Sequence, residues 1–292
     1  METNNYINEE GTQMKILDVQ NFSKSYDDLE VIHNISFSIN KGDMFAILGV
    51  NGAGKTTLLE CIEGLRPYNA GVIDFCNSSG KIKNLFGVQL QSSSLPENIT
   101  IEEIIKLLCL WNNNHDYDTL ISLFNLNQIK NQKYKTLSTG QKRKLHLVLS
   151  LVNDSDILFL DEPTAGLDVE ARAEFHQMLI DLNKAGKTII FSSHDMNEVE
   201  SLCNQMILLK DGEIRYLGSI LNFKKTSTKK YKAHIQTIES NDYVTHEFAD
   251  YTNGLYELIL DYKSKNQIIT DLKIEQPSLE DVFLKVAKEK TK

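Results

Sequence analysis

The sequence lacks both a long apolar segment and a recognisable signal peptide. The longest apolar candidate, "IIKLLCLW" at 104–111, is shorter than the about 20 residues that a membrane-spanning helix needs, and Lys106 interrupts it. The N-terminal segment, "METNNYINEE", has neither the basic start nor the apolar stretch of a secretory leader. We therefore expect no membrane-spanning helix and a cytoplasmic location.

Cysteine is scarce, and the four cysteines form no recognisable cluster. No C-x-x-C pair occurs, and no histidine lies nearby at the spacing of a metal ligand. Cys61 and Cys109 fall in helical apolar patterns. We therefore expect both to be buried free thiols rather than metal ligands.

Basic residues are outnumbered by acidic ones. The formal net charge of −9 argues against a general nucleic-acid binder. An apolar content of 41% and a charged content of 24% are ordinary for a globular protein. The length of 292 residues is sufficient for one large domain, or for a main domain with an appendage.

Three short apolar runs indicate strands that are buried on both faces. They are "MFAILG" (44–49), "DILFLDE" (156–162) and "TIIFSSHD" (188–195), with helical patterns between them. This alternation of strands and helices predicts a parallel α/β core. The segments "MKILDVQNF", from Met14, and "VIHNISFSIN" (31–40) instead alternate like antiparallel strands.

The composition changes at several points along the chain, which predicts a division into domains. Residues 1–13 are a polar extension, and the main domain follows at 14–220. Within it, a helical subdomain is predicted at about 92–150, because "IEEIIKLLCLW" and "YDTLISLFNL" have helical spacing. The lysine-rich "NFKKTSTKKYK" marks a linker or domain boundary at the start of an accessory domain at 221–292, although contact with anionic lipid is an alternative for these lysines.

Two elements are predicted inside the accessory domain. "LYELIL" (255–260) is strand-like. The last element is a helix with Ser278 as its N-cap and with four apolar residues on one face. These residues are Leu279, Val282, Phe283 and Val286.

The segment "GVNGAGKT" (49–56) matches the phosphate-binding pattern G-x-x-x-x-G-K-[ST] between a predicted strand and a predicted helix. Glycines allow backbone N–H groups to surround a β-phosphate, and Lys55 supplies charge to the β- and γ-phosphates. Thr56 offers a hydroxyl to Mg²⁺. The residues expected to bind the nucleotide here are Asn51, Gly52, Ala53, Gly54, Lys55, Thr56 and Thr57.

Charged and polar groups end two of the buried strands. Asp161 comes at the carboxyl end of one strand, where open α/β sheets bind ligands, and we expect it to be the Mg²⁺ partner of Thr56. Glu162 is suited to polarise an attacking water, whereas the alternative is that these acids cap a helix after Pro163. His194 ends another strand, so a γ-phosphate contact is expected.

A second phosphate site is predicted by "YKTLSTGQKRKLHL" (134–147), which begins like a helix. Ser138 is suited to be the N-cap, and Gln141 to complete a capping box. Gly140 leaves the backbone open to close approach, and a helix N-terminus attracts anions.

Together these motifs resemble the ATP-binding subunits of ABC transporters over about residues 14–220. "LSTGQ" (137–141) resembles the signature of that family, with Thr139 where glycine is usual, and "AGLD" (165–168) resembles its D-loop. The resemblance implies an ABC-type P-loop NTPase fold: an α/β core with an antiparallel β subdomain, a helical insertion and a small C-terminal α+β appendage. It also implies that ATP and Mg²⁺ are bound.

The same resemblance implies further site residues and partners. Gln91 is similar to the Q-loop glutamine, with catalytic and metal-binding roles, and Tyr26 to the aromatic residue that stacks on adenine. Asp168 joins the nucleotide-binding set. Two such subunits pair head to tail, so that Ser138, Gly140 and Gln141 of one serve the nucleotide held by the other.

The C-terminal "QPSLEDVFLKV" (276–286) is similar to the tail of the ABC-2 exporter branch, whose members move drugs, antibiotics, peptides or polysaccharide precursors. This similarity implies a separate transmembrane subunit and a location at the cytoplasmic face of the membrane. An ATP-driven soluble machine is the alternative. A GTPase is disfavoured because "NKAG" (183–186) lacks a base-binding carboxylate, and a non-catalytic sensor because Glu162 and His194 are both present.

Overall fold

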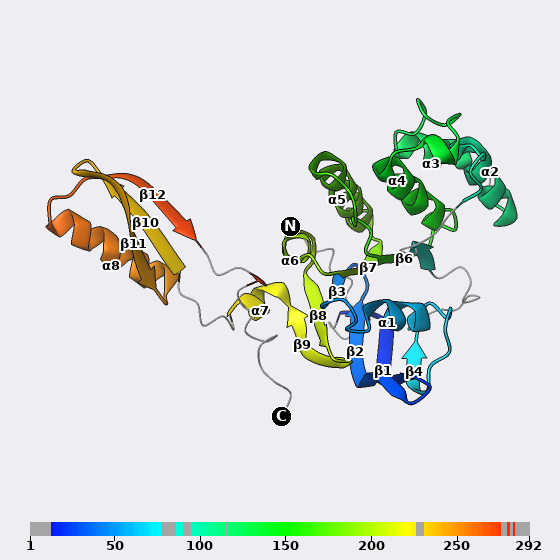
Figure 1. Cartoon of the computed structure of the whole chain (residues 1–292), viewed down its shortest axis with the longest axis horizontal. Coiled ribbons are helices and arrows are strands. Elements are labelled where there is room, and N and C mark those ends of the chain that lie inside the picture. Colours follow the sequence, from blue (N-terminus) through cyan, green and yellow to red (C-terminus); the bar gives the residue numbers. More distant parts are fainter. Residues whose placement is uncertain are drawn as a thin grey trace. The chain divides into compact units, whose positions relative to one another are not determined.

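The computed structural model describes most of the chain, namely residues 13–76, 86–89, 95–114, 116–225 and 231–275, together with 279, 280 and 283. The chain divides into two compact units, Met1–Gly218 and Ser219–Lys292, and each is described by itself (Figure 1). Among the described residues, no helix combines the length and apolar character required to cross a membrane.

The first unit contains a six-stranded sheet with the strand order β5-β6-β7-β3-β8-β9. Its strands are β3 (Met44–Leu48), β5 (Phe86–Gln89), β6 (Ile157–Asp161), β7 (Thr188–Ser193), β8 (Gln205–Lys210) and β9 (Glu213–Ser219). The pairs from β5 to β8 are parallel. Every residue of β3, β6 and β7 is buried, which confirms the prediction of strands covered on both faces.

A three-stranded antiparallel sheet of order β2-β1-β4 belongs to the same unit. It contains β1 (Lys15–Tyr26), β2 (Leu29–Asn40) and β4 (Ala70–Asp74). Residues of β1 and β2 share one apolar core with the parallel strands and with α1 (Lys55–Ile62), which contributes Leu58, Leu59 and Cys61. This core fixes α1, and therefore the loop that precedes it, against both sheets.

The predicted helical insertion is present as α2 (Ile101–Trp111), α3 (Tyr117–Leu123), a 3-10 turn (Tyr134–Thr136) and α4 (Thr139–Ser150). Thr100 begins α2 with a full capping box completed by Glu103. At Gly87 the backbone of β5 lies against the end of α4, because a Cβ atom there would be 1.8 Å from the Ser150 carbonyl oxygen. This close approach attaches α4 to the edge of the parallel sheet.

Two helices connect the central strands. After β6 comes α5 (Val169–Lys184), and after β7 comes α6 (Met196–Leu202). Asp168 caps α5 by accepting the N–H of Ala171 at 2.8 Å. The alternative role of Asp161 and Glu162, as caps of a helix after Pro163, is therefore wrong, because α5 begins at Val169, six residues after Pro163, and has its own capping carboxylate.

The second unit begins with α7 (Ile220–Lys225) and contains an antiparallel sheet of order β11-β10-β12 with helix α8 (Tyr251–Ser264). Its strands are β10 (Tyr231–Thr237), β11 (Ser240–Phe248) and β12 (Ile269–Glu275). Ala233, Ile235 and Tyr262 form its core, in agreement with α8 lying along the sheet in Figure 1.

The predicted strand at 255–260 is wrong, since these residues lie within α8. Leu255, Leu258 and Tyr262 turn inward at helical spacing, and a six-residue window is too short to separate this spacing from a strand. The final helix predicted from Ser278 falls mostly outside the described residues. Leu279 and Phe283, which are described, are helical and buried.

Candidate functional site: a nucleotide-binding cleft

The loop between β3 and α1 forms one wall of a cleft of about 330 Å³. Gly52 and Gly54 have φ angles of 84° and 100°, in the left-handed region that glycine adopts without strain. Gly54 is the last residue before α1, so the N-terminus of that helix opens into the cleft. The lining residues are Val31, Asn51, Gly52, Gly54, Lys55, Thr56, Thr57 and Glu162. Ala53 is buried behind the loop and does not line the cleft.

Lys55 is buried and is held by the loop itself. Its Nζ donates to the carbonyl oxygens of Gly49 at 2.9 Å and Val50 at 3.3 Å, and lies 3.7 Å from Oε1 of Glu162. Burial lowers the pKa of Lys55, whereas the charges of Glu162 and Asp161 act in the opposite direction. The ammonium group is therefore positioned in a partly dehydrated cleft, where an added anion gains most from it.

Asp161, the last residue of β6, is hydrogen bonded to side chains of α1 and of the neighbouring strand β7. Thr56 Oγ1 donates to its Oδ2 at 2.9 Å, and Ser192 Oγ donates to its Oδ1. Ser192 is the parallel partner of Asp161 in the β6–β7 register, and its hydroxyl also accepts the N–H of Glu162 at 3.0 Å. Sequence reasoning missed Ser192. In the sequence, Ser192 is only a serine two residues before His194. Its contact with Asp161 exists because β6 and β7 are neighbouring strands.

Glu162 is the first residue beyond β6 and has φ of 44°, a left-handed conformation that is uncommon for glutamate. Such strain costs on the order of 1 kcal/mol or more and persists where the surrounding structure fixes the backbone. In this conformation the carboxylate of Glu162 lies between Lys55 and His194. Its Oε1 is 3.2 Å from Nδ1 of His194. The structure thus brings together Lys55, Thr56, Asp161, Glu162 and His194.

The predicted second phosphate site lies elsewhere. The capping box of α4 is confirmed, with Gln141 N–H donating to Ser138 Oγ at 3.2 Å and Ser138 N–H to Gln141 Oε1 at 2.9 Å. These residues line a separate pocket of about 250 Å³ whose other wall is α5. A Cβ at Gly140 would lie 3.1 Å from the Cβ of Ala171, so Gly140 also permits close packing of α4 on α5.

Asp168 and Tyr26 are predicted site residues that do not line the cleft. Asp168 caps α5. Tyr26 ends β1 with 36% of its surface exposed, and the Nζ of Lys24 lies 4.6 Å from its ring centroid. Gln91 lies outside the described residues.

Sequence reasoning also missed two ionisable groups, Arg143 and Glu63, whose pKa values respond to the charge of Asp161. Burial lowers the pKa of Arg143, on α4, while the phenol of Tyr134 and the carboxylates of Asp161 and Glu162 raise it. Burial, followed by the charge of Asp161, raises the pKa of Glu63 to about 8. Neither residue belongs to a motif, because only the packing of α1 and α4 on the sheet brings them close.

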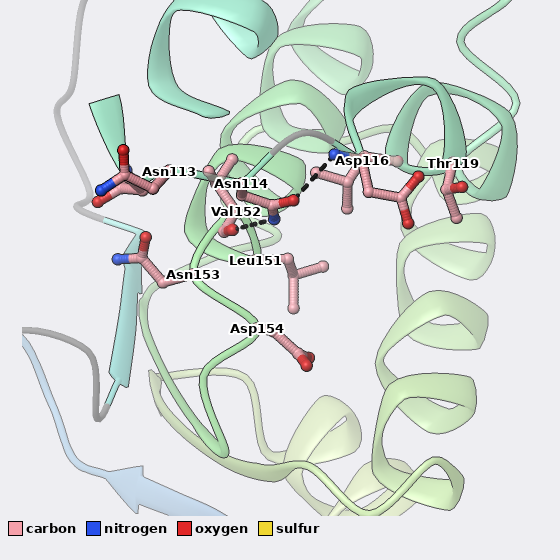
Figure 2. A pocket seen from close by; sticks show the side chains of 10 residues that line it. Asn113, Asn114, Asp116, Thr119, Leu151, Val152, Asn153 and Asp154 are labelled. Carbon is pink, nitrogen blue, oxygen red and sulfur yellow. Dashed lines mark hydrogen bonds between the residues drawn. The ribbon is translucent and has the colours of Figure 1, made fainter. Parts of the chain in front are cut away.

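A further cleft of about 550 Å³ lies where α2, α3 and the chain after α4 meet (Figure 2). Asn114 donates to the Val152 carbonyl oxygen at 2.6 Å and accepts the N–H of Asp116 at 2.9 Å. The walls of this cleft contain asparagines and the carboxylates of Asp116 and Asp154, with no lysine or arginine among the lining residues that the structure describes. These described residues therefore supply no positive charge for a phosphate.

A phosphate loop, a buried lysine and paired strand-end carboxylates define a P-loop nucleotide-binding domain. Residues 32–165 match the family model described as "ABC transporter". The Nod factor export ATP-binding protein I of Burkholderia thailandensis is 35% identical over 67% of this chain and 68% of its own. The chain therefore belongs to the ATP-binding subunits of ABC transporters, which hydrolyse ATP.

Other comparisons agree with this assignment. The linearmycin resistance ATP-binding protein LnrL of Bacillus subtilis is 27% identical over 92% of this chain and 97% of its own. The solved structure of an ATP-binding subunit of an ABC transporter superposes with a TM-score of 0.64 over 72% of this chain and 92% of its own, at 24% identity. The latter similarity concerns the fold, and it confirms the predicted ABC-type α/β architecture.

The position of Glu162 predicts the effect of its isosteric amide. Glu162→Gln keeps the shape of the side chain but removes the charge beside Lys55 and His194, so ATP turnover should fall by about 10²- to 10⁴-fold while ATP still binds. Lys55→Ala is the contrasting control, which should weaken binding itself. Phosphate release and titration calorimetry separate the two. Near-normal turnover by Glu162→Gln would exclude Glu162 from the chemistry.

The raised pKa of Glu63 predicts a pH-dependent stability. Between pH 4.5 and about 8 the unfolded chain ionises Glu63 while the folded chain keeps it protonated, so stability decreases as the pH rises. Glu63→Gln abolishes this penalty. We expect its stability relative to the parent chain to improve by about 2 to 4 kcal/mol between pH 5 and pH 8, measured by urea denaturation. An equal difference at both pH values would contradict burial of an uncompensated carboxyl.

Proposed function

We propose that this chain is the ATP-hydrolysing subunit of an exporter, which pairs with a second ATP-binding subunit around two ATP molecules and drives a separate membrane subunit. The cargo we propose is a drug, an antibiotic or a peptide. One relative is named for linearmycin resistance and another for Nod factor export, and the second name supports outward movement. The proposed location is the cytoplasmic face of the membrane, through the membrane subunit.

The domain assignment belongs to the same proposal. Residues 14–220 would be the ATPase domain, after a polar extension at 1–13, and residues 221–292 an accessory domain. A soluble ABC ATPase that is not coupled to transport is the second candidate.

The donor set at the cleft fits a magnesium ion. Thr56 offers a hydroxyl and Asp161 a carboxylate, 2.9 Å apart, and Mg²⁺ in nucleotide sites takes one or two such oxygens beside phosphates and water. When bound, Mg²⁺ neutralises charge on the β- and γ-phosphates. We assign Thr56 and Asp161 to hold it, and Gln91 from the family resemblance alone.

The remaining roles follow from what each side chain faces. Lys55 would pair with the β- and γ-phosphates, and Glu162 would orient the attacking water. His194, more than half exposed beside Glu162, would contact the γ-phosphate. Tyr26 would stack on the adenine, while Asp168 would lie next to the nucleotide of the partner.

The observation that supports pairing is the separation of two half-sites. Lys55 and Glu162 line one cleft, whereas Ser138, Gly140 and Gln141 line another. The N–H groups at the start of α4 form a second site suited to an anion. A second subunit, turned head to tail, would bring each α4 N-terminus to the phosphate held by the other subunit.

This arrangement predicts dimerisation that depends on ATP. With turnover blocked by Glu162→Gln, ATP should give a dimer on size exclusion, since a γ-phosphate held by two surfaces stabilises only the dimer. ADP should give the monomer. Adding Ser138→Arg should also give the monomer, because the longer side chain fills the site at the start of α4.

Thr119→Arg is the matched control, because it adds the same charge at an exposed position of α3. A dimer that survives Ser138→Arg as well as Thr119→Arg would show that α4 does not face a partner's nucleotide. If two different ATP-binding subunits pair, this chain stays monomeric until the second one is added.

We place the contact with the membrane subunit on the helical insertion. Leu107, Leu110 and Trp111 of α2 are 53%, 63% and 83% exposed, and Leu123 of α3 is 65% exposed. Large exposed apolar side chains gathered on neighbouring helices are typical of partner sites. The capping box that begins α2 fixes how this helix presents them.

Site-directed cross-linking tests this surface. A single cysteine at Leu110 or Trp111, in a background without the native cysteines, should cross-link to an integral membrane protein in native membranes. A cysteine at Glu174, on α5, is the control and should not. Cross-links that arise only from the second unit would contradict the assignment, and the absence of any membrane partner would favour the soluble machine.

A further inference from the structure

Glu198 is a buried carboxylate that no motif of the sequence singles out. It lies on α6 with 3% of its surface exposed. Three side chains from three different elements contact it. Thr164 Oγ1 donates to its Oε1 at 2.6 Å, Ser193 Oγ donates to its Oε2 at 2.6 Å, and His176 Nε2 lies 3.2 Å from Oε1.

The positions of these donors connect Glu198 to the reaction site. Thr164 comes two residues after Glu162, in the loop between β6 and α5, and Ser193 immediately precedes His194. Glu198 therefore joins the two short segments that hold Glu162 and His194. It does not line the Lys55 cleft.

The hydrogen bonds that Glu198 accepts from Thr164 and Ser193 form what we call the junction. A carboxylate is difficult to replace at this junction. An ionised carboxylate is an acceptor at both oxygens, and the hydroxyls of Thr164 and Ser193 each donate to one of them. An amide has one accepting oxygen and one donating NH₂ group, so the Ser193 hydroxyl, which donates to Oε2, would have to turn and accept instead. Glutamine at this position keeps the volume but replaces a charge-assisted hydrogen bond from Ser193 by a weaker neutral one in the reverse direction.

Neighbouring contacts hold α6 itself but do not duplicate the junction. Asp195 caps α6 by accepting the N–H groups of Asn197 at 2.9 Å and Glu198 at 3.3 Å, and its carboxylate lies 3.4 Å from Arg172 on α5. These bonds fix the start of the helix. None of them reaches the loop that follows Glu162.

We propose that Glu198 is a positioning residue for ATP hydrolysis, which fixes the Glu162 loop and the His194 segment relative to each other by hydrogen bonding Thr164 and Ser193. The proposal rests on ATP hydrolysis at Glu162 and not on export or on the identity of the partner. Catalytic groups need placement to a fraction of an ångström, and a displacement of about 1 Å costs about 10²-fold in rate. Nucleotide binding by Lys55 does not depend on this junction.

The test is steady-state hydrolysis of MgATP by the full chain. Glu198→Gln should lower kcat by about 10- to 100-fold and change KM by less than about twofold, because the loss concerns the transition state rather than binding. Glu200→Gln removes the same charge from the same helix and should leave kcat near that of the parent chain. Thermal melting compares the fraction folded.

A second pair of variants tests the junction from its other end and does not require Glu198→Gln to fold. Thr164→Val removes the hydroxyl at nearly constant volume and should lower kcat like Glu198→Gln, whereas Thr164→Ser keeps the hydroxyl and should restore most of it. Unchanged kcat in Thr164→Val or in folded Glu198→Gln would overturn the proposal. An equal loss in Thr164→Val and Thr164→Ser would also overturn it. Turnover by the parent chain itself verifies the ATPase separately.

Discussion

The hydrogen bonding of the Asp161 carboxylate is the interaction on which the nucleotide-binding cleft depends. One oxygen accepts the hydroxyl of Thr56, on the helix that begins at the phosphate loop, and the other accepts Ser192, on the neighbouring strand. This geometry exists only because β6 and β7 are parallel and in a register that pairs Asp161 with Ser192. Since three elements meet at one buried residue, a shift of any of them would alter the loop, the strand ends and the strained backbone of Glu162 together.

The charge of Asp161 acts on several ionisable groups around this point. It opposes the effect of burial on the pKa values of Lys55 and Arg143, and Glu63, without a hydrogen-bond partner for its Oε2 among the described residues, keeps its proton to a higher pH than an ordinary glutamate. Burial weakens hydration of each charge, so each depends on its neighbours. The charges around the cleft therefore complement those of an anion that binds together with a cation.

Some features of this protein follow from the sequence alone. The apolar runs that became β3, β6 and β7 are long enough and uniform enough that no other element suits them, and the phosphate loop has a strand before it and a helix after it. The capping box at Ser138 is equally local, since its partners are three residues apart. The window 255–260 shows the limit, because six apolar and polar residues fit a strand or a helix until α8 packs on its sheet.

The tertiary structure decided what local patterns cannot express. Ser192, Arg143 and Glu198 belong to no motif, and each acquires its role from a neighbour that is 30 or so residues away along the chain or from packing on another helix. Gly140 also allows Ala171 of α5 to pack closely against α4, and this contact likewise depends on how the two helices cross. Sequence thus determined which residues could bind phosphate, through spacing and backbone freedom. Strand order and helix packing decided which side chains hold those residues in place, because distances between elements are set by the shared core and not by position along the chain.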